Sequence, residues 1–213
     1  MIPMEIDELW VFRIISIQNL EKDLMNGLYS KNSAPEDPGR VIIGNKEIIG
    51  ERDTRIVKCY PETVVNDYVP FYFSVRTPML FNIITGQGVP KINQNDIVYI
   101  CCKMTDLTSL QKPWCFTDGN AAKRITKFYN DLANLDKIDW PSIQSEDFRH
   151  INADGDEDRV RKKHAEFLVK DKVPHSKITG IVVVNANVKA KVEGIVSQCN
   201  LKIEVKVKPK FYF

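Results

Sequence analysis

The chain has 213 residues, of which 43% are hydrophobic and 27% are charged. These values exclude global disorder, and the length suits a single domain with a substantial core over residues 1–213. The formal net charge is only +2, so affinity for nucleic acid must come from a local patch and not from the overall field.

Targeting and redox signals favour a cytoplasmic protein without a membrane partner. No run approaches the ~18 continuous apolar residues of a membrane helix, and residues 1–7 are acidic, unlike a signal peptide. The five cysteines form no C-x-x-C pair, so buried free thiols are expected. With three histidines, neither a zinc site nor a Ser-His-Asp hydrolase is favoured, and we expect no metal.

The N-terminal half combines strands with a long irregular segment. Residues 10–15 are bulky and β-branched, which predicts a strand. Ser16 can cap a helix that ends at Gly27. Residues 30–67 begin with turn formers and show no period, so we expect a loop that is either functional or disordered. The aromatic run 69–74 predicts a second strand.

The C-terminal half mixes strands with helices. Asp118 is placed to cap a helix, because Ile125, Phe128, Leu132 and Leu135 follow a period of 3.6 residues. Residues 96–104 are almost wholly apolar and predict a strand at the centre of a sheet. Three further strands are predicted over residues 166–169, 178–184 and 201–207, and an amphipathic helix over residues 188–199. Because these elements lack a regular βαβ alternation, an α+β domain is favoured.

Two acidic patterns suggest metal chemistry only weakly. Asp154, Asp156 and Asp158 occupy positions one, three and five of a calcium loop, but position six is Arg159 instead of glycine. A solvated acidic turn is therefore favoured. Glu204 and Lys206 share one face of a strand, as in some metal-dependent nucleases, but no upstream carboxylates are clearly placed to hold the metal.

Several basic residues allow more than one interpretation. Arg13 lies in an apolar strand, where a guanidinium must be paired or must face a ligand, so structural pairing and phosphate binding are both open. Arg52 and Arg55 follow the irregular segment and, as exposed loop charges, carry no assignment from the residues alone. The basic run 159–163 is either a solvated helix face or a phosphate-contacting patch, and the residues favour the first.

Several separated motifs, in one order, resemble the DarT-type DNA ADP-ribosyltransferases. The order and spacing match from the strand around Arg13 to the aromatic C-terminus. The motifs are residues 43–45 and 49–52, 66–73, 77–80, 116–118, and 165–166 followed by an apolar strand.

The resemblance implies an ADP-ribosyltransferase fold, in which a split pair of small sheets, flanked by helices, surrounds an NAD cleft. NAD would be consumed as a substrate, with residues 30–50 as its cover and Gly44 letting the backbone approach it. Arg13 would hold the NAD phosphate or ribose, and Tyr72 and Ser74 would lie beside the nicotinamide. The implied cofactor-binding residues are Arg13, Ile14, Gly27, Gly44, Tyr72 and Ser74.

Glu166 would be the catalytic glutamate, stabilising the positive charge that builds on C1 of the ribose. Arg52 would assist by positioning and stabilising a deprotonated DNA base, because an arginine is a poor free base. Single-stranded DNA would be gripped by the basic run and the segment from about 105 to 160. The implied DNA-binding residues are Arg76, Asn120, Arg159, Arg161, Lys162, Lys163 and His164.

Departures from the family pattern concern the target base. His164 replaces a glutamine of thymine-modifying members, Asn120 replaces an expected histidine, and Arg76 is at a variable position. Thymine is the default and guanine the alternative. The resemblance further implies a monomeric toxin opposed by a macrodomain-type antitoxin. Two other functions stay open: a nuclease using Glu204 and Lys206, and a non-enzymatic single-strand binder using the basic run and the aromatic residues 71–73.

Overall fold

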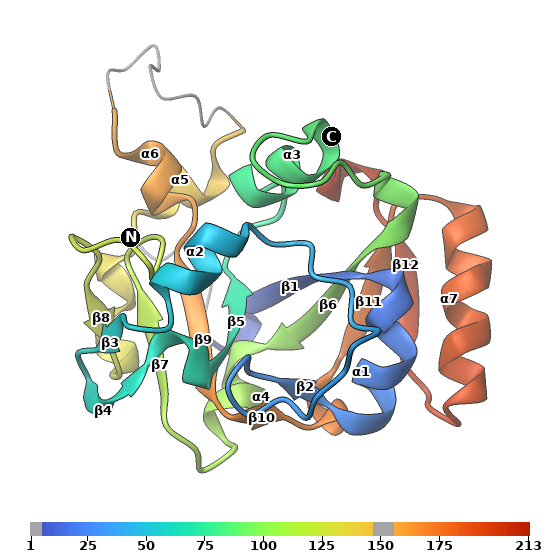
Figure 1. The fold of residues 1–213 in the computed structure, drawn as a ribbon, viewed down its shortest axis with the longest axis horizontal. Coiled ribbons are helices and arrows are strands. Elements are labelled where there is room, and N and C mark those ends of the chain that lie inside the picture. The colour runs from blue at the N-terminus through green and yellow to red at the C-terminus, as the bar shows by residue number, and fades with distance from the viewer. Residues whose placement is uncertain (1–5, 147–155) are drawn as a thin grey trace.

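The computed structural model describes residues 6–146 and 156–213. An eight-stranded sheet in the order β12-β11-β6-β1-β5-β9-β7-β8 crosses the molecule (Figure 1). Two two-stranded sheets, β10-β2 and β3-β4, lie beside it. The strands are β1 Trp10–Ser16, β2 Leu28–Tyr29, β3 Ile56–Val57, β4 Tyr60–Val64, β5 Tyr68–Tyr72, β6 Ile97–Lys103, β7 Trp114–Thr117, β8 Phe128–Tyr129, β9 Glu166–Lys170, β10 Lys172–Val173, β11 Gly180–Val183 and β12 Glu204–Val207.

The large sheet is split between β1 and β5. The register joins these two strands at one residue pair, Phe12 with Tyr72, whereas β1 pairs with β6 from Trp10 to Ser16 and β5 pairs with β9 from Tyr68 to Tyr72. The halves β12-β11-β6-β1 and β5-β9-β7-β8 therefore diverge on either side of this pair. This confirms the predicted α+β ADP-ribosyltransferase fold with its split pair of small sheets.

Helices flank both halves. The helix α7 packs against β11 and β12 and contacts α1, at the right of Figure 1. The α-helices are α1 Leu20–Asn26, α2 Lys46–Glu51, α3 Pro78–Thr85, α4 Met104–Thr108, α5 Trp140–Gln144, α6 Arg159–Lys162 and α7 Ala186–Gln198. In the part of the chain that the structure describes, none of the helices combines the length and the apolar character needed to span a bilayer.

Local sequence signals placed most of these elements correctly. The predicted central strand is β6, whose residues from Ile97 to Cys102 are all buried. Ser16 accepts a hydrogen bond from the Gln18 amide, and α1 ends at Gly27, which has φ of +83°. The irregular segment after residue 30 contains more structure than expected, because α2, β3 and β4 lie within it.

The predicted helix from Asp118 to Leu135 is wrong. Residues 118–127 form a loop, and the following residues form β8 and a 3₁₀ helix, Leu132–Lys137. The Asp118 carboxylate accepts the Lys127 amide across the loop and does not cap a helix. Arg55 binds four backbone carbonyls between Ala121 and Thr126, and carbonyls held in this way are drawn away from helical hydrogen bonding.

Candidate active site

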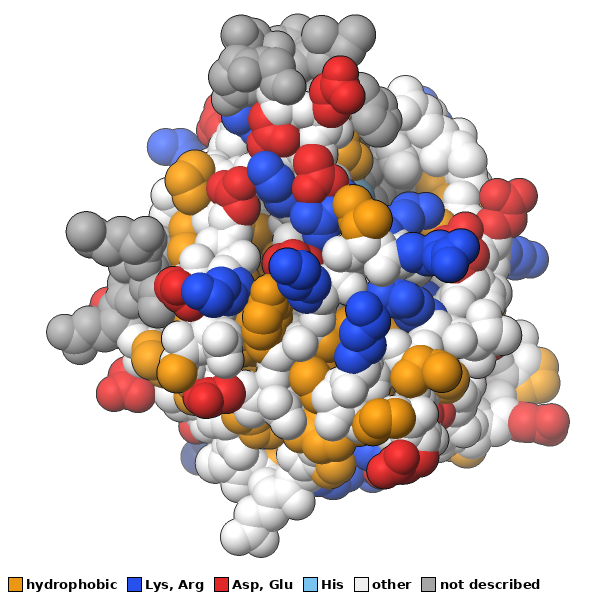
Figure 2. All heavy atoms as spheres, turned by 90° about the vertical axis from the view of Figure 1, so that its left-hand side faces the viewer, with side chains coloured by type: hydrophobic (Ala, Val, Ile, Leu, Met, Phe, Trp, Pro, Cys, Tyr) orange, Lys and Arg blue, Asp and Glu red, His pale blue; other side chains and the backbone are white. Residues whose placement is uncertain are grey.

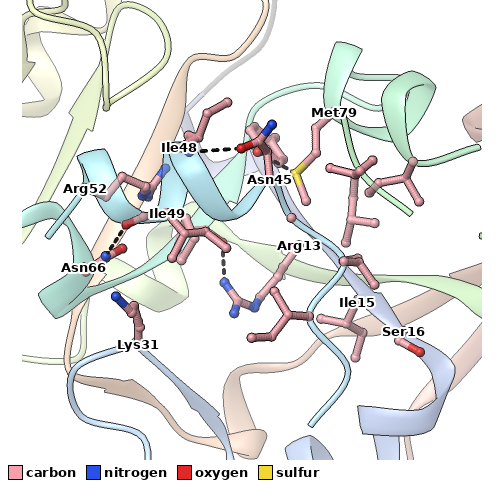
Figure 3. Close-up of a pocket in the computed structure, with 18 of the residues that line it drawn as sticks. Arg13, Ile15, Ser16, Lys31, Asn45, Ile48, Ile49, Arg52, Asn66 and Met79 are labelled. Carbon is pink, nitrogen blue, oxygen red and sulfur yellow. Dashed lines mark hydrogen bonds between the residues drawn. The ribbon is translucent and has the colours of Figure 1, made fainter. Parts of the chain in front are cut away.

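A cavity of about 380 Å³ opens where the two halves of the sheet diverge. Its walls come from β1, β5, β9 and α2, and from the irregular segment between Arg40 and Asn45. Figure 3 shows Arg13 and Arg52 approaching the cavity from different elements, β1 and the end of α2. Of the predicted site residues, the cavity is lined by Arg13, Ile14, Gly44, Arg52, Tyr72, Asn120, His164 and Glu166.

Glu166 and Arg52 form a buried ion pair at this cavity. The Arg52 Nη1 atom lies 3.1 Å from Oε1 and 3.0 Å from Oε2 of Glu166. Glu166 is 1% exposed and Arg52 is 9% exposed. A buried carboxylate must be paired to keep its charge, and the guanidinium supplies this pairing from a helix that is distant in the sequence.

A backbone amide completes the support of the carboxylate. Ala121 N–H donates to Glu166 Oε1 at 3.0 Å, so Oε1 receives two donors while Oε2 receives only Arg52. The Glu166 amide donates to Thr117 Oγ1, and that hydroxyl donates to Gly119 O at 2.7 Å. The first residue of β9 is therefore held by the loop after β7, and Oε2 keeps lone-pair capacity for a hydroxyl donor.

Arg13 has an incomplete set of partners. One guanidinium nitrogen donates to Pro70 O at 3.1 Å, across the split in the sheet, but Nε is buried without a hydrogen-bond partner among the described residues. Burial lowers the pKa of Arg13 to about 10, so the guanidinium stays charged at neutral pH. A buried donor facing a cavity is costly unless a ligand accepts from it, and this fits the phosphate or ribose hydroxyls of NAD.

Tyr72 provides an aromatic wall beside the carboxylate. It is the partner of Glu166 in the register of β5 and β9, and its hydroxyl contacts Met79 Sδ at 3.0 Å. Burial raises the pKa of Tyr72, and the nearby charge of Glu166 adds to the shift. The hydroxyl is therefore neutral over the working pH range, and the ring offers an apolar face for a planar group.

His164 lies at the same wall and faces Tyr72, with 6.1 Å between the ring centroids. Its Nδ1 lies 2.8 Å from Val160 O, which requires this nitrogen to be the donor. Burial lowers the pKa of His164, so the ring is neutral at pH 7 and Nε2 is left as an acceptor. Asn120 also lines the cavity, and its own Oδ1 accepts the Ala122 amide.

Two of the predicted NAD-binding residues lie outside the cavity lining. Ser74 is buried, donates to Val75 O and accepts from Lys163 Nζ. Gly27 ends α1 against β10, where an added Cβ would lie 2.6 Å from Val173 O. The position of Gly27 therefore indicates a role in chain packing, because only glycine tolerates both the positive φ and the close approach.

Replacing Gly27 by alanine is expected to lower the free energy of unfolding by about 1–3 kcal/mol, because of strain at a positive φ and overlap with the β10 backbone. Urea denaturation monitored by circular dichroism measures this change. The KM for NAD should stay near the wild-type value at a temperature where the variant is folded. A large rise in the KM for NAD without a loss of stability would show that Gly27 contributes to NAD binding and not to chain packing.

The basic run is occupied by ion pairs within the protein. Arg161 binds Asp118 and Asp158, and Lys162 binds Asp139 and Asp156. The DNA contacts predicted for these residues therefore compete with existing partners.

Three other predicted DNA contacts also have partners in the fold. Lys163 is 2% exposed and donates to Ser74 Oγ, Ile143 O and Ser145 O, so burial withdraws it from any DNA phosphate. Arg159 lies 4.0 Å from Asp156. Arg76 stacks on the Phe213 ring at 4.7 Å and pairs with Glu146.

The groups that hold the Arg52–Glu166 pair were not predicted from the sequence. Asn66 binds both Ile49 O and the Asp53 carboxylate, and its backbone amide donates to Arg52 O, so it fixes the end of α2. The Ala121 group that binds Glu166 is a backbone amide, which no residue type in the sequence reveals. Arg55, which organises the loop containing Ala121, had no assignment from the sequence. Only the motif spanning residues 66–73 pointed to Asn66.

The two weak metal patterns gain no support. Glu204 and Lys206 are exposed and pair with each other at 2.9 Å. No cluster of three or more potential metal-ligating His, Cys, Asp or Glu side chains occurs within residues 6–146 and 156–213. Of the proposed calcium loop, Asp154 lies outside the described residues, while Asp156 and Asp158 accept from Lys162 and Arg161.

Comparison with known proteins places this site in a family. A family model described as "ssDNA thymidine ADP-ribosyltransferase, DarT" matches residues 12–213. A DNA ADP-ribosyl transferase of Escherichia coli O127:H6 is 34% identical over 95% of this chain and 93% of its own length.

Two solved structures of Thermus sp. 2.9 DarT share the fold at 29% identity. The structure in complex with ADP-ribosylated ssDNA has a TM-score of 0.88 and covers 96% of each chain. The structure in complex with NAD⁺ has a TM-score of 0.83 and covers 96% of this chain and 98% of its own. The chain therefore belongs to the DarT family of NAD-dependent DNA ADP-ribosyltransferases.

Proposed function

We propose that the chain transfers ADP-ribose from NAD to a base of single-stranded DNA, with thymine as the default base, and releases nicotinamide. The observation that carries the proposal is the buried Arg52–Glu166 pair at the cavity, with one carboxylate oxygen less engaged than the other. The relatives support the two substrates, because one Thermus DarT structure holds NAD⁺ and another holds ADP-ribosylated ssDNA.

Glu166 acts on the sugar that carries the leaving group. Its Oε2 accepts a hydrogen bond from the ribose 2′-OH, and its charge stabilises the positive charge that develops on C1 as the bond to nicotinamide breaks. The new bond forms between C1 and a nitrogen of the base, nicotinamide leaves as a neutral molecule, and the proton of that nitrogen passes to solvent. Arg52 holds Glu166 in place and stabilises the base as the proton leaves.

The remaining predicted cofactor residues bind NAD and orient it in the cavity. Arg13 meets the phosphate or ribose of NAD with its buried Nε, and Tyr72 lies beside the nicotinamide ring. Ile14 and Gly44 line the same cavity, and Gly44 allows the backbone of the cover, residues 30–50, to approach NAD. This cover is tied to the body of the protein, since Asn19 exchanges two hydrogen bonds with the Val41 backbone.

The target base is set by the residues around Glu166. His164 lines the cavity, and with Nδ1 donating to Val160 O its Nε2 is left as an acceptor. Such an acceptor suits a base edge that carries an N–H donor, and both thymine and guanine have one. Asn120 lines the same cavity. Thymine stays the default because the family model carries the description thymidine, and guanine is the alternative.

The wider setting follows from the resemblance to the family. We propose a single domain over residues 1–213 that acts as a monomeric toxin in the cytoplasm and is opposed by a macrodomain-type antitoxin that removes the modification. Induced expression in a bacterial host should arrest growth, and co-expression of such a hydrolase should restore it.

Mass spectrometry of random-sequence single-stranded oligonucleotides after incubation with NAD tests the activity and the base together. We expect a mass increase of one ADP-ribose, dependent on NAD and accompanied by nicotinamide release. Fragmentation of the product should place the modification on thymine. Modification confined to guanine would overturn the default base, and strand cleavage independent of NAD would overturn the proposed function.

A further inference from the structure

We propose that the loop between β7 and β8, residues 118–127, binds the phosphates of the single-stranded DNA substrate through Lys123, Arg124 and Lys127. The inference rests on the proposed function and names the surface that the DNA backbone follows. The resemblance implies DNA contacts from both the basic run 159–163 and the segment from about 105 to 160, and the inference places the main phosphate contacts on this one loop of that segment.

The charges of this loop are available, unlike those of the basic run. Lys123, Arg124 and Lys127 are all exposed. The Lys123 ammonium lies 3.6 Å from Glu51, with both side chains about half exposed, and such a surface ion pair is weak. Neither Arg124 nor Lys127 makes a side-chain hydrogen bond or ion pair with the residues that the structure describes. Two cations are therefore unpaired among the described residues, and the third is held only by a weak surface pair.

The loop also borders the catalytic carboxylate. Asn120 lines the cavity, and the next residue, Ala121, donates its amide to Glu166 Oε1. Burial is the main cause of the lowered pKa of His164, and the charge of Lys123 contributes to it. A strand held by Lys123, Arg124 and Lys127 would therefore pass directly beside the position where a base must enter.

The loop has a fixed shape before any ligand binds. Arg55 donates to the carbonyls of Ala121, Lys123, Arg124 and Thr126 and stacks over the Phe128 ring at 5.5 Å. From the other side, Arg161 binds Asp118 and the Thr126 hydroxyl. Two arginines thus use their donors to shape the loop, and preorganisation reduces the entropy lost when DNA binds.

An apolar side chain stands among the cations. Ile125 is 69% exposed, between Arg124 and Lys127, and offers a surface for a sugar or an unstacked base. Combined charge and apolar exposure is typical of surfaces that follow single strands. The loop joins β7 and β8 at the left of Figure 1, the side that faces the viewer in Figure 2, where lysine and arginine side chains gather across the middle.

The test is the salt dependence of binding to a single-stranded oligonucleotide of random sequence, measured by fluorescence anisotropy without NAD. The loop variant is Lys123→Ala/Arg124→Ala/Lys127→Ala. The matched control removes the same charge from the α7 end of the molecule: Lys189→Ala/Lys191→Ala/Lys202→Ala. A third variant, Lys162→Ala, tests the basic run. Melting temperatures establish that each variant is folded.

Each phosphate contact on a single strand contributes about 0.7 to the slope of log K against log salt concentration. The loop variant should therefore lose about 2 from that slope and bind at least about tenfold more weakly at moderate salt, while the control triple variant keeps the wild-type slope. A loop variant that matches the control, or a larger loss for Lys162→Ala, would overturn the inference.

The proposed function is tested separately with the wild-type protein. If the wild-type chain binds the oligonucleotide and modifies it, but the loop variant keeps the wild-type slope, only the assignment of this loop fails. If the wild-type chain binds DNA with a loop-dependent slope but transfers no ADP-ribose, the loop assignment holds and the proposed reaction fails. If it does not bind DNA at all, both fail.

Discussion

Replacing Glu166 by glutamine is expected to lower the rate of ADP-ribose transfer to DNA by about a thousandfold or more, because one charged oxygen in a water-poor site contributes several kcal/mol to the transition state. Glutamine keeps the size of the side chain and can still accept the Ala121 amide through its carbonyl oxygen. What it removes is the negative charge facing C1 of the ribose.

The measurement is single-turnover transfer to an oligonucleotide, together with nicotinamide release and the affinity for NAD. The affinity should change far less than the rate. Glu204→Gln is the matched control and should transfer at the wild-type rate, because Glu204 is exposed and, within the described part of the chain, pairs only with Lys206. A Glu166→Gln protein that remains folded and labels DNA at the wild-type rate would remove Glu166 from the mechanism.

Arg52→Lys should lower the transfer rate by about 10²–10³, the range for losing one donor positioned to stabilise developing charge. Lysine keeps the charge, but its ammonium cannot reproduce the planar guanidinium that reaches both oxygens of Glu166. Arg52→Gln should be worse, since it leaves the Glu166 carboxylate buried without a counter-charge.

Separate kcat and KM values for NAD and DNA distinguish this role from simple binding. Because Arg52 is proposed to act on the reacting groups, kcat should fall more than either KM rises. The Lys variant should recover part of the activity that the Gln variant loses. Equal activity of wild type, Lys and Gln proteins would contradict a role for the Arg52–Glu166 pair in the reaction.

Local sequence signals predicted the elements that local interactions determine. The apolar run 96–104 became β6, and the capping serine and terminal glycine bounded the first helix, because each depends on residues a few positions apart. The region after Asp118 failed for the opposite reason. Its period of 3.6 residues was real, but Arg55, more than sixty residues earlier, binds the carbonyls that a helix would need.

Only those parts of the candidate site that are made by side chains could be predicted from the sequence. Motif order led to Glu166 and Arg52, and the structure brings them within 3.1 Å. The amide of Ala121 could not be found in this way, because a backbone group has no residue type. The ion-pair partners of the basic run could not be predicted, because Asp118 and Asp139 precede it by many residues and only the fold brings them together.

The single residue pair between β1 and β5 has a thermodynamic consequence. Between β1 and β5, few backbone hydrogen bonds hold the two halves of the sheet together. The Arg13 side chain adds one hydrogen bond across this boundary, to Pro70 O. In the proposed complex, a dinucleotide bound by Arg13 on one half and by Glu166 on the other would act as a non-covalent crosslink. Its binding free energy would then also stabilise the contact between the two halves of the sheet, and each turnover would release that crosslink only when the ADP-ribosylated DNA dissociates.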